Sequence, residues 1–479
     1  IIVSLCEESN AQTVMRALSS CCEDVSMATT KNGIYYLNIP RFKQRFGFVI
    51  ANSDNLYHTL DVLKVADTVM LLWPLSGELS PVSRLVLNCM FAQGLPTVVS
   101  AVQGLSALPQ KQKDAAKRAV TKLIEQWTLE PKFHDTDSFS DGLVLLRQIG
   151  GCKRKPLVQQ ERRTHIIADE WEIEKNELKN GICTLKMSGF VRGPPLNVNH
   201  LVHLPGMGDF QMQQIDLLSD PFPYQPSRKS AAKTEEIRVD SGDAPRPLEK
   251  ASPALQWQLQ SEAEPDPLQA EQTWPTAEEL QEAEIERKKL KKVPKGTSDY
   301  QAHWILDDTE YISGQSEEGD SSRDSEVEEE ASDVSESDED MKEEEFDQEE
   351  LMSHGWYVSI SIANVPEILV EERLGRGAPL VAIGLLEHEQ KTTLVNLVLR
   401  KHHSCHVSLK AKDRLVFHVG HRRFTACPTF SQHTNGDKHK MERFLQPGVA
   451  TVASVYAPII YPPASVLVFR EDSKGKHLN

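Results

Sequence analysis

The sequence lacks the features that mark membrane and secreted proteins. No apolar run approaches the roughly 20 residues that cross a bilayer, and the first residues show no signal-peptide pattern. The eight cysteines include no C-x-x-C pair and no regular spacing, which disfavours a disulfide framework. We therefore expect a soluble, intracellular protein with reduced thiols.

A phosphate-binding loop is also lacking where the pattern of the chain calls for one. Residues 1–5 form an apolar run typical of a buried parallel strand, and residues 11–18 begin a helix. A nucleotide-binding domain places G-x-x-x-x-G-K-[ST] at this junction, because glycine amides surround the phosphates and the lysine neutralises them. Residues 6–10 instead read CEESN, with two carboxylates at Glu7 and Glu8, no glycine and no lysine. Such a loop repels a triphosphate.

Two further nucleotide-binding signals are missing. Residues 50–54 lack the glycine of the Asp-x-x-Gly motif that holds magnesium, and residues 102–105 replace the Asn-Lys-x-Asp motif that reads guanine, so we interpret Gly104 as a strand-end turn. The chain also has no G-x-S-x-G motif, no H-E-x-x-H motif and no cysteine with a fixed histidine partner. We interpret Asp61 as a helix-face charge and Asp67 as a helix-end residue. We expect neither catalysis nor a cofactor.

The negative charge of the chain is concentrated in one segment. Residues 307–351 hold 22 acidic and 2 basic residues, a net −20, so the rest of a chain with net charge −17 carries +3. Residues 355–479 hold 16 lysines and arginines against 10 acidic residues, and nine of the 16 histidines. Two interpretations of the acidic residues 317–350 stay open, namely nucleic-acid mimicry that masks a basic surface and a flexible solubilising spacer, which is the commoner case.

Periodicity predicts a multidomain α/β plus β protein in four segments. Residues 1–155 predict a doubly wound sheet, with strands at 46–50, 68–73 and 97–102 and helices at 56–65, 82–92 and 111–127. Residues 160–222 predict a small antiparallel β-barrel with glycine and proline corners. Residues 223–354 predict a disordered acidic linker, and residues 355–479 a larger β-rich region.

One island of the linker, near residues 271–307, differs from its surroundings. It combines a charged helical stretch with two tryptophans, a composition that favours folding against a partner or against the barrel of the same chain. The candidate anchoring residues are Trp274, Pro275, Tyr300 and Trp304.

Several motifs together resemble the Bms/Tsr family of small-ribosomal-subunit assembly factors, which are relatives of translational GTPases. They lie at residues 60–67, 91–97, 101–104, 189–193, 196–199, 205–211, 271–275, 292–298, 430–433 and 456–459. Because the phosphate loop is missing, the chain resembles the Tsr branch, whereas the Bms branch keeps that loop. The resemblance implies a degenerate GTPase-like domain followed by translation-factor-type barrels. It also leads us to expect further residues before Ile1, before Gly355 and after Asn479.

Cations and histidines cluster between residues 400 and 443 beside an aromatic residue. This composition suits RNA phosphates and exposed bases, a solvated barrel rim is the alternative, and the resemblance favours RNA. The candidate RNA-binding residues are Arg400, Lys401, His402, Arg422, Arg423, Phe424, Lys438, Lys440 and Arg443. The histidine and cysteine spacings match no paired zinc-ligand pattern, so we expect no metal.

The resemblance implies a non-catalytic factor that binds the pre-small (40S) ribosomal subunit. Such a factor supports maturation of small-subunit rRNA and blocks early binding of translational GTPases and subunit joining. Its implied partners are the pre-40S particle, small-subunit rRNA, ribosomal proteins and other assembly factors, with no membrane. The implied location is the nucleolus and nucleus, with passage to the cytoplasm on pre-40S particles. Two alternatives stay open: an active GTPase with unconventional residues, and a scaffold that binds basic proteins through its acidic run.

Overall fold

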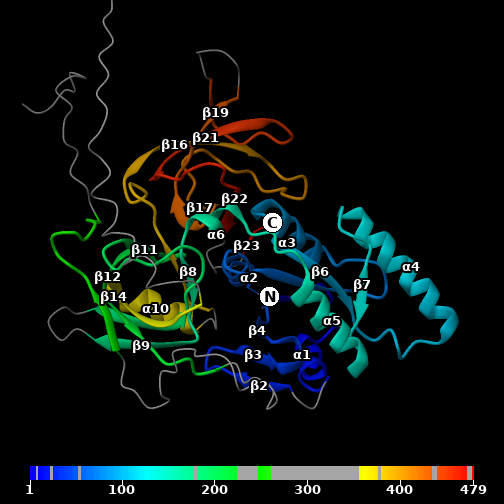
Figure 1. The fold of residues 1–479 in the computed structure, drawn as a ribbon. Coiled ribbons are helices and arrows are strands. Elements are labelled where there is room, and N and C mark those ends of the chain that lie inside the picture. Colours follow the sequence, from blue (N-terminus) through cyan, green and yellow to red (C-terminus); the bar gives the residue numbers. More distant parts are fainter. Residues whose placement is uncertain are drawn as a thin grey trace, which may run out of the picture. The chain divides into compact units, whose positions relative to one another are not determined.

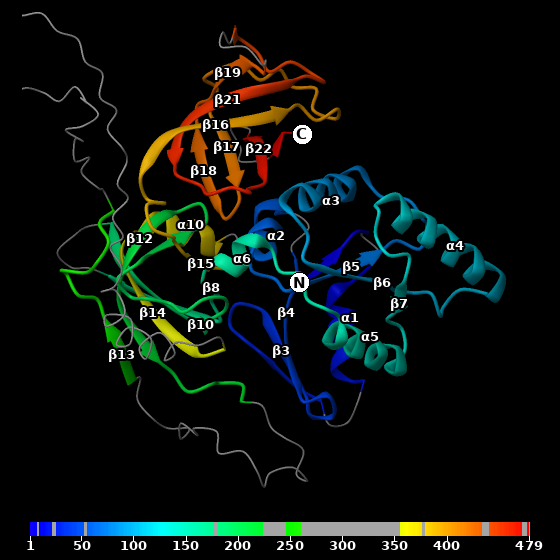
Figure 2. The ribbon, with the colours of Figure 1, turned by 45° about the horizontal axis from the view of Figure 1, so that its top comes forward.

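The computed structural model describes most of the chain outside the acidic linker. The described residues are 1–6, 9–21, 25–51, 55–175, 181–223, 246–259, 355–375, 379–433, 440–471 and 477–478. Several residues singled out in the sequence lie outside these ranges, namely Glu7, Glu8, residues 52–54, Trp274, Pro275, Tyr300, Trp304, residues 317–350 and Lys438. Figures 1 and 2 show the ribbon in two orientations.

The first part of the chain builds a parallel sheet with helices on both faces (Figure 1). The strands run in the order β1-β5-β6-β7, and each neighbouring pair is parallel. Their bounds are Ile2–Ser4 for β1, Thr68–Trp73 for β5, Thr97–Val102 for β6 and Phe133–Asp135 for β7. β5 has a strand on each side and a layer of helices on each face. Its side chains are therefore buried on both faces, which explains its continuous apolar sequence.

Five helices form the two layers over this sheet. They are α1 (Ala11–Ser19) and α5 (Phe139–Gly151) on one face, and α2 (Leu56–Leu63), α3 (Pro81–Gln93) and α4 (Gln110–Gln126) on the other. Alternate residues of β5 serve the two layers: Leu71 packs with α2, α3 and α4, whereas Met70 packs with α1 and α5. The helices and the two central strands expected here are confirmed at nearly the predicted bounds.

Residues 26–49 form an antiparallel ribbon that the expected alternation of strands and helices did not include. Its strands are β2 (Ser26–Thr29), β3 (Ile34–Ile39) and β4 (Gln44–Val49), paired in that order. The strand predicted at 46–50 therefore exists, but it pairs with β3. The ribbon meets the parallel sheet through a bridge between Ile2 and Ile50 and through Phe48, which packs in the same core as Met70. The cause is local, because a short 3-10 helix at Pro40–Phe42, ended by Lys43 with φ of 53°, folds β4 back on β3.

The second sheet draws its strands from both sides of the linker and takes one, β13, from within residues 223–354, where the sequence predicted disorder. Its order is β8-β15-β11-β12-β14-β10-β9, and β13 pairs with β12. The bounds are His165–Ile167 for β8, Glu170–Lys175 for β9, Ile182–Phe190 for β10, Leu201–Leu204 for β11, Gly208–Leu217 for β12, Arg246–Lys250 for β13, Tyr357–Pro366 for β14 and Val381–Gly384 for β15.

The domain boundary expected at residue 355 does not coincide with a boundary between sheets. β14 lies between β10 and β12 and pairs antiparallel with both. Its neighbours on both edges satisfy its backbone groups, and its side chains are buried almost throughout, which shows that both faces of the strand are covered. Two short helices flank this sheet, α6 (Val158–Arg162) before it and α10 (Glu367–Gly375) after β14.

The remaining strands form two four-stranded sheets that share one core. The first has the order β16-β21-β19-β20 and the second β18-β17-β22-β23. Leu397, Phe417, Phe430 and Val455 pack between them. The bounds are Thr392–Arg400 for β16, Leu415–Val419 for β17, Arg422–Ala426 for β18, Thr429–Gln432 for β19, Met441–Glu442 for β20, Ala450–Pro458 for β21, Val466–Glu471 for β22 and His477–Leu478 for β23.

Candidate functional site

In the loop between β1 and α1, Ser4 and Asn10 make hydrogen bonds to other parts of the chain. The Ser4 hydroxyl donates to the Cys6 carbonyl oxygen at 2.8 Å. Asn10 caps α1, since its Oδ1 accepts from the Gln12 amide at 2.9 Å, and the Asn10 amide itself donates to Gln103 Oε1 at 2.9 Å. A nucleotide-binding loop would turn amides at this helix end toward phosphates, whereas here protein oxygens already accept from them.

The loop after β6 is closed by a carboxylate from the β7–α5 turn. Asp137 accepts hydrogen bonds from the Gly104 amide at 2.6 Å, from the Ser106 amide at 2.7 Å and from the Ser106 hydroxyl at 2.7 Å. Burial alone would raise the pKa of Asp137, but the hydrogen bonds from Ser106 and Gly104 outweigh it and lower that pKa. Gly104 has a φ of 88°, so the strand-end turn expected there is confirmed. In a G domain the loop at this position binds guanine. Here the Asp137 carboxylate occupies the amides of that loop.

Asp61 is a buried ion, which corrects its interpretation as a helix-face charge. Its carboxylate is inaccessible to solvent and lies 3.1 Å from Lys64 Nζ, 2.6 Å from Arg373 Nη2 and 3.1 Å from Arg423 Nη1. Burial would raise the pKa of Asp61, but Arg423, Lys64 and Arg373 lower it far below its usual value. Burial also lowers the pKa of Lys64 to about 8. One carboxylate therefore ties α2 to α10 and to β18.

The same two arginines reach a third segment. Arg373 Nη1 and Arg423 Nη2 donate to the Pro205 carbonyl oxygen in the β11–β12 turn at 2.9 and 3.0 Å. The Arg423 guanidinium also lies 4.9 Å from the centre of the Tyr57 ring, on α2. We call Asp61, Lys64, Arg373 and Arg423 the Asp61 cluster.

A second buried cluster surrounds Arg422. Its Nη1 donates to both oxygens of Asp209 at 2.8 Å, and its Nη2 donates to the Glu389 carbonyl oxygen at 2.9 Å. His203 Nδ1 contacts Asp209 at 2.7 Å, and the Glu389 carboxylate accepts from Arg163 Nε at 3.2 Å. Arg422 and Glu389 are 2% and 0% exposed, so these ions are almost completely removed from water.

These contacts correct the expectation that Arg422, Arg423 and Phe424 face RNA. Arg422 and Arg423 are held by carboxylates of other segments, and Phe424 stacks on Phe417 with a ring-centre distance of 5.7 Å. The physical reason is the cost of burying an ion, which only a partner of opposite charge offsets. In this structure the three side chains join segments of the chain to one another.

The other candidate residues of this region lie at the surface. Arg400, His402, Lys440 and Arg443 are exposed, and Lys401 is half-buried. Bridges from Lys401 to Pro447 and from Lys410 to Phe444 bring the end of β16 next to the segment after β20. The Arg443 guanidinium lies 5.6 Å from the centre of the Phe444 ring. We call Arg400, Lys401, His402, Lys440 and Arg443 the basic rim.

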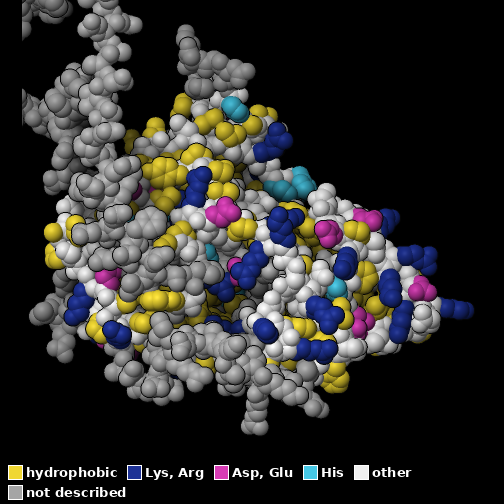
Figure 3. Space-filling view, viewed as in Figure 1, with side chains coloured by type: hydrophobic (Ala, Val, Ile, Leu, Met, Phe, Trp, Pro, Cys, Tyr) yellow, Lys and Arg dark blue, Asp and Glu magenta, His cyan; other side chains and the backbone are white. Residues whose placement is uncertain are grey.

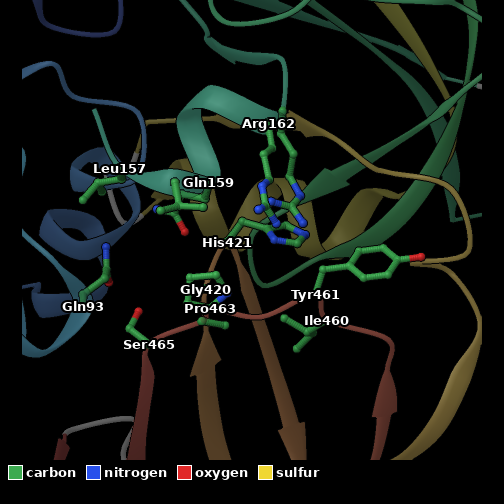
Figure 4. A pocket seen from close by; sticks show the side chains of 13 residues that line it. Gln93, Leu157, Gln159, Arg162, Gly420, His421, Ile460, Tyr461, Pro463 and Ser465 are labelled. Atoms are coloured by element: carbon green, nitrogen blue, oxygen red, sulfur yellow. The ribbon is translucent and has the colours of Figure 1, made fainter. Parts of the chain in front are cut away.

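A cavity of about 330 Å³ lies between α6, the end of α3 and the loops around β18 and β22 (Figure 4). Gln93 and His421 line it and are 6% and 2% exposed. Gln93 Oε1, Gln159 Nε2 and His421 Nε2 have no hydrogen-bond partner among the described residues, although His421 Nε2 lies 3.8 Å from Glu389 Oε2. Burial, and then neighbouring arginines, lower the pKa of His421, so the ring is neutral. The cavity suits hydrogen bonding to a small polar group.

In the described part of the chain, no three His, Cys, Asp or Glu side chains are grouped as metal ligands. Of the helices in that part, none combines the length and the apolar character needed to cross a bilayer.

Three known sequence families match successive parts of the chain. "Tsr1, G-like domain" matches residues 1–151, "AARP2CN (NUC121) domain" residues 153–221, and "40S ribosome biogenesis protein Tsr1 and BMS1 C-terminal" residues 278–479. The third match includes the linker island from residue 278 onward and the last β domain. These family matches place the chain in the ribosome biogenesis class, with a G-like domain at residues 1–151.

Similar curated proteins share one description, "Pre-rRNA-processing protein TSR1 homolog". The Xenopus laevis protein is 36% identical over 92% of this chain and 69% of its own length, and the Homo sapiens protein is 35% identical over 94% and 70%. The Caenorhabditis elegans protein is 32% identical over 99% and 72%. The chain belongs to the TSR1 family of pre-rRNA-processing proteins.

Solved structures of translation factors align with most of the chain. The bacterial selenocysteine-specific elongation factor EF-Sec aligns with 100% of this chain and 56% of its own, at 9% identity and a TM-score of 0.43. The elongation factor SelB from Methanococcus maripaludis, in complex with a GTP analogue, aligns with 98% and 74%, at 8% identity and a TM-score of 0.43.

Proposed function

We propose that this chain is a non-catalytic assembly factor that binds the pre-40S particle and supports maturation of small-subunit rRNA. Membership of a pre-rRNA-processing family and the match to a 40S biogenesis family support the proposal. The proposed partners are small-subunit rRNA, ribosomal proteins and other assembly factors. The proposed place of action is the nucleolus and nucleus, followed by the cytoplasm on pre-40S particles.

The observation that carries the non-catalytic part is the Asp61 cluster. A GTPase switch works because segments near the nucleotide alternate between two arrangements when the γ-phosphate leaves. Here α2 is joined to α10 and β18 by a buried carboxylate with three cations. Removing one partner from such a group costs about 3–5 kcal/mol, which favours a single arrangement. The closed loops at Asn10 and Asp137 also support a role without nucleotide.

In the proposed action the G-like domain blocks a binding site by its shape and needs no nucleotide-dependent change of conformation. A G-like domain held in one arrangement occupies the site of translational GTPases on the immature subunit and blocks early subunit joining. Competition tests this part: purified small subunits receive a labelled translational GTPase, and the chain is titrated in. We expect displacement of the GTPase. Simultaneous binding of both proteins would contradict the blocking role.

Sedimentation tests binding itself. The full-length protein is expressed with an affinity tag, and cell extract is separated on a sucrose gradient at moderate salt. We expect the protein to travel with particles that contain small-subunit precursor rRNA. A protein that stays at the top of the gradient while the precursor particles are intact would overturn the proposal.

A further inference from the structure

Helix α4 carries a row of cations that the sequence analysis did not single out. The helix contains five lysines and arginines, at 111, 113, 117, 118 and 122, against two acidic residues. At 3.6 residues per turn, Lys111, Arg118 and Lys122 fall within about 40° of one another around the helix axis. All three are exposed. They form a straight row about 16 Å long on the side opposite the core.

No carboxylate of the described residues holds these cations, in contrast to three lysines elsewhere on the surface. Among the described residues, none of the five lies within ion-pair distance of an acidic side chain, and the Arg118 Nε donates to the Asp114 backbone carbonyl. Lys31, Lys175 and Lys186 are also surface cations, but each pairs with a glutamate, at 3.2, 2.5 and 2.5 Å. Figure 3 shows Lys and Arg side chains gathered over the part of the face formed by α4 and α5.

The rest of α4 restricts the kind of partner. Its apolar side chains, Ala116, Val120, Leu123 and Ile124, are buried in the core of the first domain. Its solvent face has no exposed large apolar side chain. A membrane-bound helix needs an apolar face free for the bilayer, and a protein interface needs apolar or aromatic anchors at its centre. A row of point charges without apolar anchors instead suits a phosphate backbone.

We propose that Lys111, Arg118 and Lys122 contact RNA phosphates and form a second RNA-binding surface, separate from the basic rim. This inference rests on the proposed function, because small-subunit rRNA is the polyanion that such a factor meets. The contacts carry no base readout, so binding through α4 is independent of sequence and strongly dependent on salt.

The test measures the salt dependence of binding to an RNA duplex of about 20 base pairs, which presents phosphates in a regular A-form helix. Fluorescence anisotropy gives Kd for the full chain at several potassium chloride concentrations. The variant combines Lys111→Gln, Arg118→Gln and Lys122→Gln, which keep good helix formers in place. The matched control combines Lys31→Gln, Lys175→Gln and Lys186→Gln and removes the same charge from paired sites. Circular dichroism verifies that both variants are folded.

We expect the α4 variant to lower the slope of log Kd against log salt by about 2 to 3 units, and the control to match the wild type. Equal losses in both variants would show an effect of net charge alone and overturn the proposal. Wild-type slopes in both variants would overturn it too, while RNA binding through the rim and the proposed function would stand. A wild-type chain that binds neither the duplex nor pre-40S particles would remove the proposed function itself. Binding of polyglutamate through α4 in place of RNA would show an acidic protein partner and also overturn the proposal.

Discussion

Arg400 and Arg422 stand in similar stretches of sequence and in opposite surroundings. Arg400 ends β16, is followed by Lys401 and is exposed. Arg422 begins β18, is followed by Arg423 and is 2% exposed, with its guanidinium on Asp209. The pairs Arg400–Lys401 and Arg422–Arg423 carry the same charge, so composition does not distinguish them. Their roles differ because a carboxylate from a distant segment reaches one of them and not the other, so a cation here either joins segments of the chain or remains available to a partner.

The largest expected loss of stability comes from removing the carboxylate at the centre of the Asp61 cluster. Asp61→Ala leaves Lys64, Arg373 and Arg423 buried without their anion, so we expect the free energy of unfolding to fall by about 3–5 kcal/mol. Urea unfolding of the purified chain measures it. Asp114→Ala, at an exposed position of the same domain, is the control and should stay within about 0.5 kcal/mol of wild type. A loss below about 1 kcal/mol for Asp61→Ala would show that the cluster does not hold the segments together.

The direct form of the comparison replaces each arginine in turn. Arg422→Gln leaves Asp209 buried beside a neutral amide, and we expect about 3 kcal/mol of lost stability. Arg400→Gln should change stability by less than about 0.5 kcal/mol. Thermal unfolding of the two variants under the same conditions compares them. Equal destabilisation, or a larger effect at Arg400, would break the distinction between joining and available cations.

Asp169 is also a buried carboxylate, but no cation of the described residues lies within ion-pair distance of it, so its pKa shifts in the direction opposite to that of Asp61. Asp169 accepts from the Tyr36 hydroxyl at 2.8 and 3.0 Å, and burial raises its pKa to about 7. The folded state therefore binds a proton more tightly than the unfolded state, whose carboxyl titrates near 4. This contribution to stability is complete below pH 4 and is lost as the pH rises through 7, at up to about 1.4 kcal/mol per pH unit.

The measurement is the free energy of unfolding between pH 4 and 7 in wild type and in Asp169→Asn. The free energy of unfolding of wild type minus that of Asp169→Asn should fall steadily from pH 4 to pH 7, because only wild type loses the stabilising proton at this position. A difference that is flat with pH would show that Asp169 titrates as it does in the unfolded chain.

The smallest effect is expected at the rim, on binding and not on stability. Arg400→Gln combined with Arg443→Gln removes two exposed cations, so we expect the salt slope for RNA binding to fall by about 2 units and the unfolding free energy to stay unchanged. Anisotropy titrations with single-stranded and duplex RNA measure it. Unaltered RNA affinity would identify the rim as a solvated edge, the alternative that the composition of this region also allows.

Local patterns in the sequence were sufficient for most elements of the first domain. The bounds of β5, β6, α3 and α4 follow from apolar runs, from the Ser80 cap and from Gly94, which has a φ of 107° at the end of α3. Of the antiparallel ribbon only β4 was predicted, at 46–50; the four residues of β2 are mostly exposed and give no apolar run.

Contacts between distant residues were beyond the sequence patterns. Arg373 lies 312 residues after Asp61, and Arg422 lies 213 residues after Asp209, so no spacing rule connects them. The same holds for β14, whose neighbours β10 and β12 precede the linker. One signal was available for α4: five cations on a helix whose apolar face was already recognisable, and plotting them on the helix would have shown the row.

Isothermal titration calorimetry with magnesium and GTP tests the central claim most directly. The loops after β1 and β6 are closed by Asn10, Gln103 and Asp137, and the segment around α2 is fixed by Asp61. The account therefore predicts only heats of dilution, with the intact full-length protein, at nucleotide concentrations well above those in cells. A saturable titration with micromolar Kd would contradict it and would support the alternative of an active GTPase with unconventional residues.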